Sequence, residues 1–144
     1  MNDSQVKAFN DLLHVVQFKL RFDRLYASSE LLKDIAPIDL RILRLISANQ
    51  DIILREVREE LEIPQSTLTS AIDRLEKKGL IERFISQRDR RSFVLKLTDE
   101  GRRVQDEHDR IDEMVIRRLL EIFETDEERQ VFVQGLEKIA RRLR

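Results

Sequence analysis

Residues 54–101 read LREVREELEIPQSTLTSAIDRLEKKGLIERFISQRDRRSFVLKLTDEG, and they contain the most informative structural pattern of the chain. A short helical segment at 54–61 is interrupted around Pro64, and a second helical segment at 65–78 ends at Gly79. Glycine suits the left-handed position that commonly follows a helix. The buried face of the second helix is predicted to carry Leu68, Ile72 and Leu75. Two amphipathic helices joined by a tight turn predict a helix-turn-helix.

A basic hairpin is predicted directly after the second helix. Residues 80–85 and 92–97 have the β-branched and aromatic composition of short strands, and apolar residues alternate along the second one. Phe84 and Phe93 fit this pattern as inward-facing residues. The tip between the strands is rich in arginine, whose planar, forked guanidinium group suits a contact of defined geometry. A helix-turn-helix followed by a basic hairpin is much more specific than either part, and it indicates a winged helix.

The flanking sequence is helical. Apolar residues recur three or four apart over 4–33, over a helix that starts at Pro37, and over 98–123, and Thr125 opens a last helix with a capping box. The predicted fold class is therefore mainly α with a small β-hairpin wing (α+β). Within one domain over 1–144 we expect three parts: N-terminal helices at 4–48, a winged helix-turn-helix lobe at 52–97 and C-terminal helices at 98–144.

The terminal helices predict a homodimer. Their apolar stripes exceed what a winged-helix lobe of roughly 60 to 70 residues needs for its own core. Apolar faces that one chain cannot cover are most simply buried against a second copy, and symmetric dimers are common. A larger monomeric helical core is the alternative.

Composition excludes several classes of protein. No apolar run approaches the ~18 to 20 residues of a membrane span, and the polar residues 1–5 predict no secretory signal. Cysteine is absent, which excludes disulfides and thiolate ligands and agrees with a cytoplasmic location. The net charge is −1, but residues 66–103 carry ten Lys or Arg against six acidic residues. A basic centre between acidic ends is an asymmetry that favours polyanion binding.

Two sets of side chains are candidates for contacting double-stranded DNA. Small hydroxyl and amide groups on a helix can approach base edges and phosphates in the major groove, and arginines on an extended tip can enter a narrow minor groove. An ordinary polar helix face and a solvated turn are the alternatives. The helix set is Gln65, Ser66, Thr67, Thr69, Ser70 and Arg74. The wing set is Arg83, Arg88, Asp89, Arg90 and Arg91.

These segments resemble the MarR family of transcriptional regulators. The resemblance rests on STLT at 66–69, IDRLEKKGLIER at 72–83, RDRRS at 88–92 and LTDEG at 97–101. It implies a homodimeric regulator, a repressor, whose terminal helices intertwine while two winged lobes straddle a pseudo-palindromic site. It also implies that the helix set lies in the major groove, that Arg91 enters the minor groove beside Arg90, and that Asp89 orients these arginines.

The resemblance also implies a small-molecule effector that releases the DNA. Core packing is an equal alternative for each of the residues that we expect to line its pocket, which are His14, Phe18, Arg21 and Tyr26. Two residues depart from the family pattern. Ile53 stands where Thr or Ser usually caps the first helix of the motif, and Glu62 stands where Gly is common in the turn.

Catalysis has little support in the sequence. His14 and His108 are far apart, and His108 with Asp112 would give only a two-residue metal pair at i, i+4. No Gly-rich phosphate loop or nucleophile motif is present. We therefore expect no enzymatic activity, no metal and no cofactor. The remaining alternative is a winged helix that binds protein. The arginine-rich tip disfavours this alternative, because protein-docking surfaces favour apolar anchors.

Overall fold

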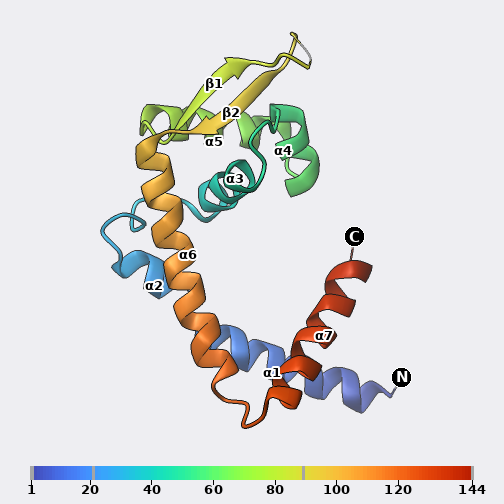
Figure 1. The fold of residues 1–144 in the computed structure, drawn as a ribbon. Helices are drawn as coiled ribbons and strands as arrows, with labels where there is room; N and C mark the ends of the chain where they lie inside the picture. Colours follow the sequence, from blue (N-terminus) through green and yellow to red (C-terminus); the bar gives the residue numbers. More distant parts are fainter. Residues whose placement is uncertain (1, 21, 89, 144) are drawn as a thin grey trace. The chain divides into compact units, whose positions relative to one another are not determined.

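The computed structural model describes residues 2–20, 22–88 and 90–143 (Figure 1). The chain divides into two compact units, one formed by residues 23–110 and the other by the two ends of the chain. None of the helices within these described ranges combines the length and apolarity that crossing a bilayer requires. The helices of the first unit are α2 (Phe22–Ser28), α3 (Pro37–Ala48), α4 (Leu54–Leu61), α5 (Gln65–Lys77) and the beginning of α6 (Asp99–Leu120).

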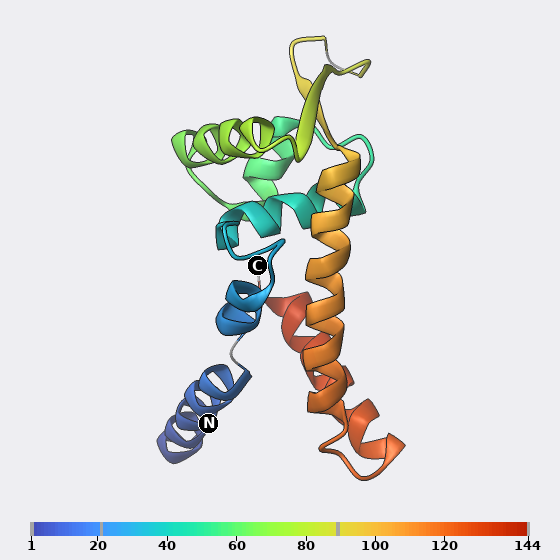
Figure 2. The same cartoon turned by 90° about the vertical axis from the view of Figure 1, so that its left-hand side faces the viewer.

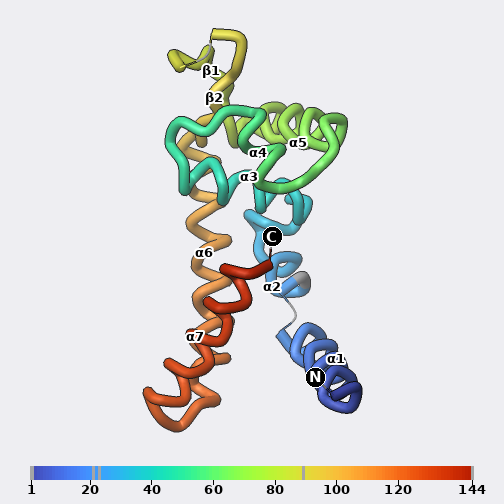
Figure 3. Tube along the Cα trace, turned by 90° about the vertical axis from the view of Figure 1, so that its right-hand side faces the viewer, coloured from blue at the N-terminus to red at the C-terminus, as the bar shows by residue number. Residues whose placement is uncertain are grey.

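The helix-turn-helix forms as predicted. Helix α3 begins with Pro37, whose missing N–H would have no partner in the first turn of a helix. The turn from α4 to α5 can be followed in Figure 3; in it Glu62 is left-handed, with φ 50° and ψ 40°. Helix α3 packs on α5 and on the hairpin, and α5 packs on the first strand. The fully buried core includes Ile42, Leu43, Val57, Leu68, Ile72, Leu75 and Leu95.

The wing is an antiparallel hairpin of β1 (Ile81–Ile85) and β2 (Phe93–Leu97). Ile81 pairs with Leu97 at its base and Ile85 with Phe93 toward its tip. The segment before α4 adds a short third partner, because Ile53 forms a bridge with Val94 and the amide of Leu95 donates to the carbonyl of Ile52 over 3.1 Å. The tip projects beyond the helices of this unit (Figures 1 and 2).

The junction between the wing and α6 explains the LTDEG segment. The Thr98 hydroxyl accepts a hydrogen bond from the Gly101 amide at 3.0 Å and donates to the Gly79 carbonyl at 2.6 Å, so it caps α6 and fastens it to the end of α5. A Cβ at Gly101 would lie 1.9 Å from the carbonyl oxygen of Leu80. Glycine is therefore required here by the close approach of two backbones.

The second unit contains α1 (Asp3–Leu20), the end of α6 and α7 (Asp126–Arg142). Thr125 caps α7 and Glu128 completes the capping box, as predicted. The corner between α6 and α7 is closed by the Phe123 and Phe132 rings, 5.0 Å apart, and by Arg129, which donates to the carbonyls of Leu120 and Phe123. Helices α1 and α7 contain no buried residue among those described, although both carry apolar stripes.

Two expectations about local structure are wrong. The single helix predicted over 4–33 is described as two elements, α1, which ends at Leu20, and α2, which ends at Ser28. At Ser28 the serine hydroxyl donates to the carbonyl of Leu25 and a series of turns begins; serine competes in this way with helical backbone bonds. Phe84 and Phe93 do not face inward, since each is 46% exposed. Phe84 lies on β1 opposite Val94, and Phe93 lies on β2 opposite Ile85, which is 68% exposed.

Candidate DNA-binding surface

Helix α5 presents one polar face to solvent and one apolar face to the core. Leu68, Ala71, Ile72 and Leu75 are fully buried, which turns the opposite side outward. Thr69 donates from its hydroxyl to the Gln65 carbonyl and accepts a bond from the Gln65 amide side chain at 3.3 Å, so these two side chains are paired in the free chain. All six residues of the predicted helix set are exposed on this side, namely Gln65, Ser66, Thr67, Thr69, Ser70 and Arg74.

Arg74 is held by a buried acid. Its Nε and Nη2 atoms donate to the two carboxylate oxygens of Asp39 at 3.1 and 2.6 Å. Asp39 comes from α3 and is 1% exposed, whereas the Arg74 side chain is 45% exposed. The pair therefore fastens α5 to α3. It also fixes the guanidinium plane while leaving other N–H donors of the fork directed at solvent, where a phosphate oxygen could accept them.

Arg83 joins the wing to α5. Its Nη2 atom lies 2.5 Å from a carboxylate oxygen of Asp73 and 2.6 Å from one of Glu76. Both acids belong to α5, and Arg83 stands on β1 opposite Leu95. This arginine was predicted to contact DNA, but the structure places its charge between two carboxylates that hold the base of the wing against the helix.

The tip of the wing contains the remaining predicted arginines. Ser86 is buried, and it shapes the tip by donating its amide to Ser92 and accepting the Arg88 amide on its hydroxyl. The Arg88 side chain turns back toward the start of α4, whereas Arg90 and Arg91 are exposed at the tip. Asp89, predicted to orient them, lies outside the described residues.

The two departures from the family pattern have clear structural outcomes. Ile53 occupies the N-cap of α4, and its amide donates to the Glu56 carboxylate at 2.9 Å, so half of a capping box survives without a hydroxyl. Glu62 adopts the left-handed conformation that glycine takes at little cost. Helix and turn therefore form despite both residues.

Three of the four residues predicted to line an effector pocket lie on described helices. His14 and Phe18 are exposed on α1, Tyr26 is partly buried on α2, and Arg21 lies outside the described residues. Tyr26 meets His108 edge to face, with the ring centres 5.1 Å apart. His108 is thus part of an aromatic contact in the interior of its unit. The pocket remains a prediction.

Sequence reasoning missed the acids that organise this surface. Asp39 could have been found from the sequence, because it lies four residues before Leu43 and therefore shares the buried face of α3. A buried carboxylate is expected to pair with a cation. The other acids are on exposed or half-exposed positions, where nothing in the sequence distinguishes them from solvated charges. The overlooked residues are Asp39, Asp73 and Glu76, together with Glu56 on α4.

An outward polar helix, joined by ion pairs to a basic hairpin, is the arrangement of a winged helix-turn-helix of the DNA-binding class. Comparison with known proteins agrees. The model of the MarR family matches residues 37–93. The chain is 29% identical over 110 residues to the uncharacterised HTH-type transcriptional regulator YfiV of Bacillus subtilis, covering 76% of this chain and 68% of YfiV.

Two further comparisons extend this result. Identity to the HTH-type transcriptional repressor MdtR of Bacillus subtilis is 37% over 67 residues, which cover 46% of this chain and 43% of MdtR. The aligned part thus spans less than half of that relative. The structure is similar to that of Streptococcus pneumoniae FabT solved in complex with DNA, with a TM-score of 0.71 and 28% sequence identity. The match covers 97% of this chain and 92% of the FabT chain. Over its central part the chain is therefore similar to the MarR family, and these relatives are named as transcriptional regulators.

Proposed function

We propose that this chain regulates transcription by binding duplex DNA, with α5 in the major groove and the tip of the wing in the adjacent minor groove. The observation that carries the proposal is the coupling of the two elements. Arg83 on the wing is bound to Asp73 and Glu76 on α5, so the exposed face of the helix and the exposed Arg90 and Arg91 belong to one lobe of fixed geometry. The similarity to FabT, solved in complex with DNA, supports the same function.

The proposal assigns different roles to the predicted residues. Ser66, Thr67 and Ser70 are exposed for base or phosphate contacts, and Gln65 with Thr69 would exchange their mutual hydrogen bond for contacts to DNA. Arg74, already oriented by Asp39, would meet a phosphate or a guanine. Arg91 would enter the minor groove, with Arg90 on it or on its phosphates.

We further propose that the active form is a homodimer on a pseudo-palindromic operator. Helices α1 and α7 bury none of their described residues, and a second copy is the simplest partner that would cover them. The exposed apolar residues of these helices are Val6, Phe9, Leu12, Leu13, Val15, Val16, Phe18, Val131, Val133, Leu136 and Ile139. Two-fold symmetry of the protein would then match two half-sites one helical turn apart.

The remaining parts of the proposal follow from the family. The chain would act as a repressor in the cytoplasm, without enzymatic activity, and a small molecule would release it from DNA. His14, Phe18 and Tyr26 stay the candidates for binding that effector. No group of three or more His, Cys, Asp or Glu side chains suited to a metal occurs among the residues that the structure describes.

Selection of bound duplexes from a random DNA pool at ~0.15 M salt tests the function. We expect an inverted repeat with half-sites about one turn, ~10 base pairs, apart. On that operator, Arg91→Ala should weaken binding by about 1–3 kcal/mol and reduce the preference for narrow, A·T-rich flanks. If ligand-free protein enriches no sequence, the function is not sequence-specific DNA binding.

A further inference from the structure

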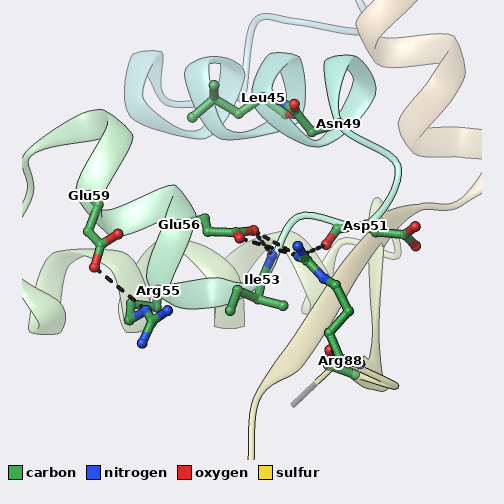
Figure 4. A network of polar contacts seen from close by, with 9 residues as sticks. Leu45, Asn49, Asp51, Ile53, Arg55, Glu56, Glu59 and Arg88 are labelled. Carbon is green, nitrogen blue, oxygen red and sulfur yellow. Dashed lines mark hydrogen bonds and ion pairs between the residues drawn. The ribbon is translucent and has the colours of Figure 1, made fainter.

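The side chain of Arg88 is bound to the start of α4. Its Nη2 atom lies 2.7 Å from the carbonyl oxygen of Asp51 and 3.2 Å from the nearer carboxylate oxygen of Glu56 (Figure 4). The second oxygen of Glu56 is 3.3 Å away. These contacts join the tip of the wing to a point more than thirty residues earlier in the chain.

The Glu56 carboxylate binds both the start of α4 and the tip of the wing. The same carboxylate that meets Arg88 also accepts the amide of Ile53 at the beginning of α4. Ile53 in turn bridges to Val94 on β2. The wing is therefore attached to this segment twice, by backbone pairing at β2 and by the Arg88 side chain at the tip.

We propose that Arg88 is a positioning residue, which sets the direction of the wing through Glu56 and Asp51, and that it does not itself contact DNA. The inference rests on the proposed DNA-binding function, because a direction of the wing matters only if the tip binds something. The guanidinium charge of Arg88 is already balanced by a carboxylate and a carbonyl. The tip arginines Arg90 and Arg91 would then supply the DNA contacts, aimed by the Arg88 attachment.

Changing Glu56 has opposite effects on DNA affinity in two cases: when Glu56 holds the wing through Arg88, and when Glu56 acts only as a negative charge near the DNA. DNA repels a carboxylate, so removing an acid near the binding surface strengthens binding when only long-range charge matters. If Glu56 holds the wing in place, removing its charge weakens binding instead. Glu56→Gln is a clean substitution because glutamine also accepts the N-cap amide in a capping box. It keeps the start of α4 and removes the ion pair.

The chain offers a matched control one turn further along α4. Glu60 is exposed and lines the same open cavity of about 510 Å3 as Glu56 and Arg88, but it takes no part in the Arg88 contacts among the described residues. Glu60→Gln therefore makes the same change in charge, on the same helix, without touching the attachment of the wing.

Affinity for the selected operator is measured for Glu56→Gln, Glu60→Gln, Arg88→Gln and the Glu56→Gln/Arg88→Gln double variant, each over a range of salt. We expect Glu56→Gln to weaken binding about three- to tenfold, the size of one typical hydrogen bond at a partly exposed site, and Glu60→Gln to leave it unchanged or slightly tighter. Arg88→Gln should cost the same as Glu56→Gln, and the double variant no more than either. The salt slope should not change.

Different results overturn the inference. If Glu56→Gln binds as tightly as the parent or more tightly, or if the two losses add, Arg88 does not act through Glu56. A fall of about one in the salt slope for Arg88→Gln would show that the guanidinium contacts a phosphate directly.

A measurement without DNA separates this inference from the proposed function. Trypsin cleaves after Arg90 and Arg91, and cleavage of a folded protein follows the opening of the segment. A released tip should be cut at least about threefold faster in Glu56→Gln than in Glu60→Gln. Equal rates would refute the attachment even if the parent binds DNA; faster cleavage together with no DNA binding by the parent would refute the proposed function alone.

Discussion

Replacing Arg74 by alanine would leave the Asp39 carboxylate buried without its cation. Asp39 is 1% exposed on α3, and the Arg74 guanidinium meets both of its oxygens, at 3.1 and 2.6 Å. Removing one partner of a buried ion pair, so that the other partner remains as an unpaired buried charge, costs about 3–5 kcal/mol. Because the Arg74 side chain is 45% exposed, part of the attraction is screened, and we expect Arg74→Ala to cost about 3 kcal/mol.

The opposite substitution should cost less. Asp39→Asn keeps the shape of the side chain and one acceptor oxygen, and the guanidinium left behind already reaches water. Losing one charge-assisted hydrogen bond of this kind costs about 1.5 kcal/mol. The structure therefore predicts an asymmetry of about 1.5 kcal/mol between the two partners, with the arginine as the more costly one to remove.

Equilibrium urea unfolding at one fixed protein concentration measures both values, since the stability of a dimer depends on concentration. Lys77→Ala is the control: it removes a charge from an exposed position on α5 and should change stability by less than about 0.5 kcal/mol. The reasoning fails if Asp39→Asn is the more destabilising of the pair, or if Arg74→Ala resembles the control.

Three further predictions concern stability. Gly101→Ala should destabilise the fold by about 2–3 kcal/mol in the same assay, because the new Cβ would lie 1.9 Å from the Leu80 carbonyl oxygen, and a neutral result would mean that the junction with α6 can shift freely. Glu62→Gly should stabilise the fold by about 0.5–1 kcal/mol, since φ at this residue is 50° and glycine adopts that conformation with less strain. A loss of stability would mean that a contact of the Glu62 side chain contributes more free energy than relief of the backbone strain. Hydrogen bonds from Arg110 and Ser29 lower the pKa of Glu107 from its ordinary 4.5, so its ionised form stabilises the fold above that pH, and this contribution is lost as the pH falls through the lowered value. Urea unfolding of Glu107→Gln across the acid range should show its difference from the parent shrink as the pH falls below 4.5 and vanish only below the lowered pKa, whereas a difference that persists at the lowest pH would assign the effect to packing.

Local sequence patterns were sufficient for most of the fold. Helix α4 begins and ends at the predicted residues, Leu54 and Leu61, because a turn residue and a proline delimit its apolar period. Thr98 and Thr125 cap α6 and α7 as expected, since a cap depends on side chains within three residues of it. The end of α2 at Ser28 was missed because the apolar period continues to Leu31 in sequence although the backbone turns.

The candidate site was less accessible to sequence reasoning. The sequence alone does not distinguish the arginines of α5 and the hairpin from one another, but ion pairs formed across the fold do. Arg74 meets an acid 35 residues away and Arg88 one 32 residues away, whereas Arg83 meets two acids on α5. Sequence separation of this size is invisible to any local pattern. The prediction that Phe84 and Phe93 both face inward failed because the strand pattern does not give the register. Phe84 pairs with Val94 and Phe93 with Ile85, so the two rings lie on opposite faces of the hairpin.

Chemical footprinting on the selected operator shows which groove each element of the protein occupies. If α5 reads the major groove and the wing the minor groove of each half-site, methylation of guanine N7 should interfere with binding at two patches about one turn apart. Hydroxyl-radical cleavage should be protected in the flanking minor grooves, and Arg91→Ala should lose that flanking protection while keeping the central contacts. A footprint over a single half-site, or flanks that stay protected in Arg91→Ala, would contradict this account.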